Sequence, residues 1–203
     1  MFVLAVTGGI GSGKSTATAF FEARGAIVLD LDDIAKRLLD PDMPGYRAVL
    51  EEFGPEILGE DGLIDHARLA ALAFATRESA LELDALMHPP VYAMTVGALD
   101  ALALQAQPPR VVIIDIPLLV EAPLFIELVD AVLAISSNED TRIERLLARG
   151  MTEHDAERRI ACQASDAERR EIADYVIEND SDLANYREEL QAFWDGEVAP
   201  RVA

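Results

Sequence analysis

The chain has 203 residues and a formal net charge of −20, from 37 acidic residues against 17 lysines and arginines. This charge argues against DNA or RNA as a partner, because affinity for a phosphate backbone depends on basic residues. Hydrophobic residues make up 51% of the chain, enough for one domain with a substantial core, and the single cysteine, Cys162, excludes an internal disulfide framework.

The first six residues are mostly apolar, lack a basic flank and lead directly into a glycine-rich stretch. They predict a buried strand rather than a signal peptide. No apolar run along the chain reaches the roughly 18 residues that a membrane-spanning helix requires. We therefore expect a cytoplasmic protein without a membrane partner.

Five short segments rich in valine and isoleucine predict strands, and helical patterns fill the intervals between them. Most of these segments are apolar at successive positions, which is typical of a parallel sheet covered on both faces. The predicted strands are Val3–Thr7, Ala26–Asp30, Arg110–Ile116, Ala131–Ser136 and Asp174–Glu178. The alternation of strands and helices predicts an open α/β fold with a five-stranded parallel sheet flanked by helices.

A glycine-rich loop follows the first predicted strand and matches the pattern Gly-x-x-x-x-Gly-Lys-Ser at every defined position. Glycine allows successive backbone N–H groups to turn toward a phosphate, and the following helix adds its positive end. Lys14 is expected to reach the β- and γ-phosphates, and the Ser15 hydroxyl to bind Mg²⁺. The predicted nucleotide-binding residues are Gly8, Gly9, Ile10, Gly11, Ser12, Gly13, Lys14, Ser15 and Thr16.

The second predicted strand ends in Asp30-Leu31-Asp32-Asp33. In an open α/β sheet, ligands bind beyond the carboxyl ends of the strands. A kinase requires a carboxylate there that accepts the proton of the acceptor hydroxyl, and either Asp30 or Asp32 can supply it. Asp33 is the candidate N-cap of the helix that follows.

Two helices are predicted between residues 60 and 105, separated at His88-Pro89-Pro90 because proline interrupts the helical hydrogen bonds. This is more than one crossover between strands needs, so the segment is a candidate substrate lobe. The third predicted strand then ends at Asp115, which is placed to hold Mg²⁺ directly or through water. Glu121, just beyond it, is a candidate for the acceptor site.

The loop alone leaves other classes open, among them another small-molecule kinase and a nucleotide-binding regulator without catalysis. A regulatory GTPase should also carry an Asn-Lys-x-Asp segment for guanine, but no lysine follows Lys36. The charge distribution adds one observation. Residues 142–170 contain seven arginines against six acidic residues, in a chain that is otherwise strongly acidic.

Together these motifs resemble the dephospho-CoA kinase family, and the match extends over about residues 4–180 in the same order. The segments that carry the resemblance are Thr7–Ser15, Asp30–Ala35, His88-Pro89, Asp115–Glu121, Arg142 with Arg145 and Arg149, Arg159–Gln163, and Arg169 with Ala173–Asn179. Arg142 stands where many members of the family have glutamine, and we assign it no role.

The resemblance implies ATP-dependent phosphorylation of the ribose 3′-hydroxyl of dephospho-CoA, with Mg²⁺ as cofactor. It implies that Asp32 is the general base and that Lys14, Arg145 and Arg149 stabilise the transferred phosphoryl group. It also implies that Asn179 lies near the adenine. The acceptor contacts that it implies are Asp32, His88, Leu118 and Glu121.

The resemblance further implies a P-loop NTPase-type core with two additions. The expected nucleotide-binding core comprises residues 1–59, 106–137 and 172–203. Residues 60–105 are the expected helical CoA-binding lobe. Residues 138–171 are the expected arginine-rich lid, called the lid segment below.

Overall fold

The computed structural model describes residues 1–202, apart from the side chain of Arg77. The chain forms two compact units, one of Met1–Asp30 with Leu102–Ala203 and one of Leu31–Ala101. Across the part of the chain that the structure describes, no helix combines the length and the apolar character needed to cross a membrane.

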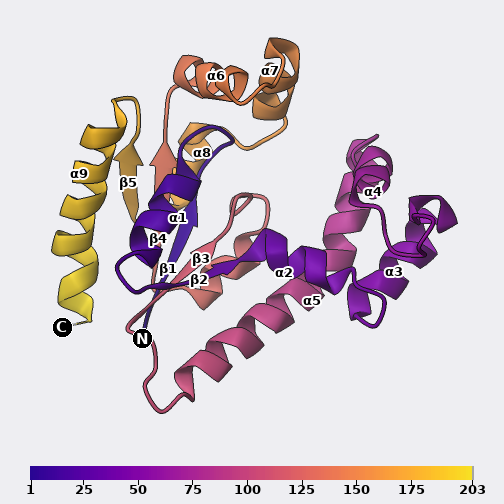
Figure 1. Cartoon of the computed structure of the whole chain (residues 1–203), viewed down its shortest axis with the longest axis horizontal. Coiled ribbons are helices and arrows are strands. Elements are labelled where there is room, and N and C mark those ends of the chain that lie inside the picture. The colour runs from indigo at the N-terminus through magenta and orange to yellow at the C-terminus, as the bar shows by residue number, and fades with distance from the viewer. Residues whose placement is uncertain (203) are drawn as a thin grey trace. The chain divides into compact units, whose positions relative to one another are not determined.

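The first unit is built on a sheet of five parallel strands in the order β2-β3-β1-β4-β5 (Figure 1). The three central strands, β1, β3 and β4, are buried at every residue, which is why they are apolar at successive positions. The strands are β1 Phe2–Thr7, β2 Ile27–Asp30, β3 Val111–Asp115, β4 Ala131–Ser136 and β5 Tyr175–Glu178. All five predicted strands, and the predicted fold class, are confirmed.

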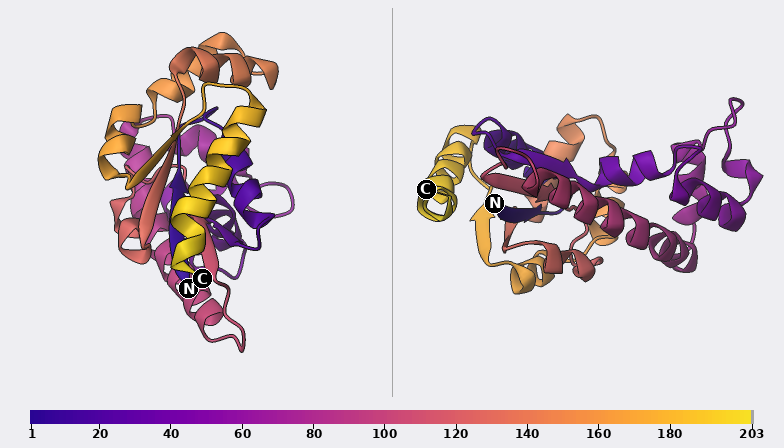
Figure 2. Two further views of the ribbon diagram at one scale, coloured as in Figure 1. Left: turned by 90° about the vertical axis from the view of Figure 1, so that its left-hand side faces the viewer. Right: turned by 90° about the horizontal axis from the view of Figure 1, so that it is seen from below.

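Helices α1 and α9 cover one face of this sheet. Their buried residues Phe21 and Leu190 belong to one apolar cluster with Leu4, Leu133 and Ile177 of the strands. Figure 2 shows α9 lying along the sheet beside β5. The helices of this unit are α1 Lys14–Glu22, α6 Glu139–Ala148, α7 Glu153–Ala161, α8 Asp166–Ile172 and α9 Leu183–Phe193, with a 3₁₀ segment at Pro123–Leu128 and short terminal turns over Trp194–Arg201.

The three helices of the lid segment each begin at a side-chain cap, which satisfies backbone N–H groups that have no partner within the helix. Asn138 caps α6, Thr152 caps α7 and Ser165 caps α8, where Glu168 completes a capping box. Figure 1 shows α6 and α7 beyond the carboxyl ends of β4 and β5, on the side of the glycine loop.

The second unit is helical and begins at Leu31, so it includes residues before the lobe expected at 60–105. Close packing explains the earlier start, since a Cβ on Gly45 would lie 2.7 Å from the carbonyl oxygen of Leu38. Its elements are α2 Leu31–Leu38, α3 Pro44–Phe53, a 3₁₀ turn at Pro55–Ile57, α4 His66–Ala73 and most of α5 Arg77–Ala103.

Helix α5 passes through Pro89 and Pro90, and the predicted helix break at His88 is therefore wrong. The two prolines remove two backbone N–H donors, but the fixed φ of proline suits a helix. The buried face on either side of the prolines keeps the helix continuous. Met87 and Val91 are 7% and 5% exposed, and the buried Thr95 hydroxyl donates to the Val91 carbonyl at 2.8 Å.

Two other helix boundaries differ from the predictions. The first of the two helices expected between residues 60 and 105 is divided, because the hydroxyl of Thr76 accepts from the Ser79 N–H at 3.1 Å and starts a new helix at Arg77. Asp33 is not an N-cap, because α2 begins at Leu31 and Asp33 lies in its first turn. There its carboxylate accepts from Lys36 at 3.0 Å.

Candidate active site

The glycine loop joins β1 to α1 at the carboxyl edge of the sheet. Gly11 and Gly13 have φ of +81° and +100°, values that residues with a Cβ rarely adopt. The Ser12 N–H donates to the Gly9 carbonyl at 3.0 Å and closes a tight turn. Lys14 then opens α1, so the positive end of that helix faces the loop. This is the strand–loop–helix arrangement that the phosphate-binding pattern requires.

Side chains from later parts of the chain hold the outer side of this loop. Four consecutive carbonyl oxygens, at residues 10–13, each accept a side-chain hydrogen bond. The pairs are Arg142 Nε to Ile10 at 2.9 Å, Arg145 Nη1 to Gly11 at 3.3 Å, Asn179 Nδ2 to Ser12 at 2.7 Å, and the Tyr186 hydroxyl to Gly13 at 3.2 Å. Binding of the carbonyl groups on the outside leaves the inner side of the loop to N–H groups, which favour an anion.

Lys14 forms an ion pair with Asp115, at the end of β3. Both side chains are largely buried, at 17% and 8% exposed, so solvent screens the pair less than it would a surface pair. Asp30, at the end of β2, lies in register beside Asp115. The structure therefore brings three of the predicted residues to one edge of the sheet.

Arg145 lies against the loop, whereas Arg149 is exposed at the C-cap of α6. The Arg145 guanidinium also donates to the Asn179 carbonyl at 2.8 Å and to its side-chain oxygen at 3.2 Å. Asn179 is 4% exposed, and both polar atoms of its side chain are bonded within the protein. Asn179 therefore contacts the glycine loop, and its expected place near the adenine stays a prediction.

Burial raises the pKa of the Tyr186 hydroxyl, which therefore stays protonated as the donor to Gly13. The pKa of Asp180 shifts in the opposite direction. Its partial burial opposes ionisation, but hydrogen bonds from the Asn138 N–H and the Ser137 hydroxyl, both at 2.8 Å, outweigh burial and lower its pKa. Asp180 thereby ties the start of α6 to the segment after β5.

A buried charge cluster, Arg142 with Asp166 and Arg169, lies behind the loop. The two arginines are 5% and 2% exposed and share the one carboxylate, at 3.9 and 3.6 Å. Burial, followed by the charge of Arg169, lowers the pKa of Arg142. Nearby, the side-chain oxygen of Gln163 accepts from the Ile10 N–H at 2.8 Å. The sequence alone assigns no role to any of these four residues, although the segment Arg159–Gln163 includes Gln163.

The predicted acceptor residues are distributed over both units. In the first unit, Leu118 is 42% exposed, and Glu121 accepts from the Ala164 N–H at 2.9 Å, which connects it to the lid segment. In the second unit, Asp32 lies exposed in the first turn of α2. His88 lies within α5, 3.8 Å from the Asp84 carboxylate one turn earlier.

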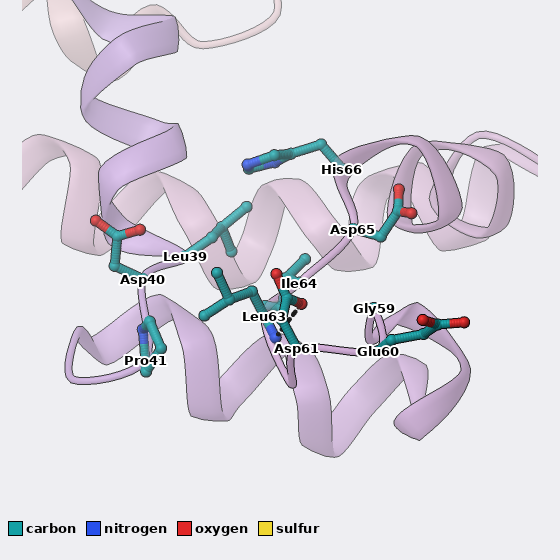
Figure 3. Close-up of a pocket in the computed structure, with 10 residues that line it drawn as sticks. All are labelled: Leu39, Asp40, Pro41, Gly59, Glu60, Asp61, Leu63, Ile64, Asp65 and His66. Carbon is teal, nitrogen blue, oxygen red and sulfur yellow. Dashed lines mark hydrogen bonds between the residues drawn. The ribbon is translucent and has the colours of Figure 1, made fainter.

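The second unit also contains a cavity of about 480 Å³ between the end of α2 and the start of α4 (Figure 3). Four carboxylates, those of Asp40, Glu60, Asp61 and Asp65, lie around it together with His66. The Asp65 carboxylate is committed to capping α4, where hydrogen bonds from the N–H groups of the first turn lower its pKa. So acidic a cavity disfavours phosphate groups, and we do not place a nucleotide there.

The model of a protein family described as dephospho-CoA kinase matches residues 2–185. The dephospho-CoA kinase of Frankia casuarinae is 36% identical over 203 residues, covering all of this chain and 86% of that protein. The dephospho-CoA kinase of Streptomyces avermitilis is 38% identical over 198 residues, covering 96% of this chain and 93% of that protein.

Solved structures show the same fold. The structure of TT1252 from Thermus thermophilus has a TM-score of 0.77 at 29% identity and covers 97% of both chains. The dephospho-CoA kinase from Campylobacter jejuni has a TM-score of 0.71 at 22% identity, covering 98% of both chains. A shikimate kinase from Acinetobacter baumannii has a TM-score of 0.57 at 15% identity, covering 98% of this chain and 96% of that one, and likewise supports the fold alone.

Proposed function

The chain belongs to the dephospho-CoA kinase family, and from this membership we propose that it transfers the γ-phosphoryl group of ATP to the ribose 3′-hydroxyl of dephospho-CoA. The products are CoA and ADP. The observation that carries the proposal is the glycine loop with Lys14 at the head of α1 and Asp115 beside it, in a chain that matches the family over residues 2–185.

The loop N–H groups and Lys14 are proposed to bind the β- and γ-phosphates. On binding, Lys14 would exchange the Asp115 carboxylate for phosphate oxygens. Phosphoryl transfer demands little covalent chemistry from the protein, so fixed donors aimed at the moving group supply most of the catalysis. Arg145, which already donates to the loop, and Arg149 one turn later are the proposed lid cations.

The residues at this edge also fit a Mg²⁺ ion brought by ATP. Magnesium prefers hard oxygen ligands and takes one or two from the protein, the rest being phosphate oxygens and water. The exposed Ser15 hydroxyl, in the first turn of α1, and the Asp115 carboxylate are such donors. When bound, the ion would neutralise charge on the phosphates.

Asp32 is the proposed general base, accepting the proton of the 3′-hydroxyl as the oxygen attacks phosphorus. It follows Asp30, the last residue of β2, by two residues, and it lies in the first turn of α2 at the start of the second unit. Residues 60–105 are the proposed CoA-binding lobe, with His88, Leu118 and Glu121 as the proposed further contacts to the acceptor.

The test is ADP release with three acceptors, namely dephospho-CoA, adenosine and shikimate, at saturating ATP and Mg²⁺. We expect turnover with dephospho-CoA alone and a product that coelutes with CoA. Turnover with another acceptor and none with dephospho-CoA would overturn the assignment. Lys14→Ala should abolish turnover and weaken ATP binding, and unchanged activity in this variant would remove the basis for the nucleotide site.

A further inference from the structure

The backbone of Ile10, at the tip of the glycine loop, is hydrogen-bonded by two side chains of the lid segment. Its N–H donates to the side-chain oxygen of Gln163 at 2.8 Å, and its carbonyl accepts from Arg142 Nε at 2.9 Å. These two residues lie more than 130 positions from Ile10 in sequence. Each of the two peptide groups that flank Ile10 therefore carries one side-chain hydrogen bond, and together the two bonds fix the backbone orientation of this residue.

The neighbouring glycines leave room for Arg142 beside the loop. A Cβ on Gly9 would lie 2.5 Å from Arg142 Nη2, and one on Gly11 would lie 2.9 Å from the Arg142 carbonyl. Both distances are shorter than real Cβ atoms show. The loop and Arg142 are therefore packed as one body, and Arg142 cannot shift without the loop.

The burial of Arg142 excludes a direct contact with a ligand in this arrangement. Its side chain is 6% exposed, and Nη2 has no solvent exposure and no hydrogen-bond partner within the described residues. The guanidinium is anchored from behind by Asp166, which also pairs with Arg169 and accepts from the Ser136 hydroxyl. The arrangement supports the loop rather than presenting a charge to solvent.

We propose that Arg142 and Gln163 are positioning residues that hold the two peptide groups flanking Ile10, and through them the glycine loop, in the orientation that binds the ATP phosphates. The inference rests on the proposed nucleotide site but not on the identity of the acceptor. What Arg142 contributes is a hydrogen-bond donor at the ε position of its side chain. Its positive charge serves only to anchor it to Asp166.

Two substitutions separate the donor from the charge. Glutamine carries an N–H donor at the same position along the side chain as Arg Nε but has no charge, whereas methionine has the same reach and neither donor nor charge. We expect Arg142→Met to weaken ATP binding, measured by titration without acceptor, about tenfold, as loss of one hydrogen bond to a buried carbonyl predicts. Arg142→Gln should stay within about threefold of the unsubstituted chain.

Steady-state kinetics supply the readout that a merely structural role would not give. In Arg142→Met the KM for ATP should rise about tenfold, while the KM for dephospho-CoA stays within about twofold. The matched control is Arg158→Met on α7, since Arg158 is 66% exposed and pairs with Asp155 of its own helix at 3.1 Å. It should change neither constant.

Three outcomes would overturn the proposal. Equal losses in Arg142→Gln and Arg142→Met would mean that the charge matters, as in an anion site. No loss in Arg142→Met, or a parallel rise in both KM values, would remove the positioning role. If Arg142→Met does not fold, variants of the half-exposed Gln163 provide the test. Gln163→Met must weaken ATP binding. Gln163→Glu, which keeps the acceptor oxygen, must retain most of it.

Because ATP binding is measured without acceptor, the two proposals can fail separately. If dephospho-CoA gives no turnover but the Arg142 variants differ in ATP affinity as stated, only the acceptor is wrong. If dephospho-CoA turns over and the variants bind ATP alike, only the positioning role is wrong.

Discussion

Replacing Gly9 with alanine will force Arg142 away from the glycine loop. The new Cβ would lie 2.5 Å from Nη2, 2.7 Å from Cζ and 3.1 Å from Nη1 of Arg142. The guanidinium is buried and has no open solvent to move into. Gly9 is not among the glycines with positive φ, so backbone strain contributes nothing and the clash alone decides the outcome.

Overpacking of this kind costs about 1–3 kcal/mol of folding free energy. Displacing Arg142 also breaks its bond to the Ile10 carbonyl, which is worth about 1 kcal/mol. We therefore expect Gly9→Ala to lower the unfolding free energy by about 2–4 kcal/mol and ATP affinity about tenfold. Urea denaturation and nucleotide titration measure the two effects.

A second substitution tests whether the contact between the new Cβ and Arg142 causes these losses. Glutamine at position 142 lacks all three atoms that the new Cβ would meet, so Gly9→Ala should cost much less in the Arg142→Gln background. If it costs the same in both backgrounds, within about 0.5 kcal/mol, the contact is not the cause and the reasoning fails. The control is Gly97→Ala at an exposed position of α5, where a Cβ meets nothing within 4 Å and alanine should stabilise the helix by about 0.5–1 kcal/mol.

Other predictions concern the base, the loop and acid stability. Asp32→Asn should abolish most turnover and leave ATP affinity nearly intact, with Asp33→Asn as the control; lost ATP affinity would instead make Asp32 a metal or structural residue. Tyr186→Phe removes the donor to Gly13 and should lower the unfolding free energy by about 1 kcal/mol in urea, and no change would show that this bond contributes nothing. Asp180 has a lowered pKa when folded, so its contribution is present above the unfolded value of about 3.9 and is lost as pH falls through the folded value. Asp180→Asn should therefore destabilise the protein at pH 7, with the difference narrowing below about pH 4, and a difference independent of pH would contradict the cause given.

The sheet could be predicted because its signal is local. Runs such as Val111–Ile114 are buried on both faces, and that burial shows in the sequence as unbroken apolar residues. Helix α5 could not be predicted in full, since proline is a local signal against a helix while the packing that overrides it comes from elsewhere in the fold. That packing buries Met87, Val91 and Thr95, and Met87 lies against Gly45, which is distant from the prolines in sequence.

The same distinction between local signals and distant packing applies to the candidate site. The pattern of the loop constrains the side that faces the phosphates, where each residue acts through its own N–H group or, at Lys14, its own side chain. The other side of the same loop is held by Arg142, Arg145, Asn179 and Tyr186, which lie more than 130 residues later in the chain. No spacing rule connects these residues to the loop. Their positions depend on the places of β4 and β5 in the sheet and on the packing of α9 against it. A phosphate-binding pattern therefore predicts that an anion is bound, whereas the rigidity of the loop, and with it the affinity, depends on side chains that only the fold brings there.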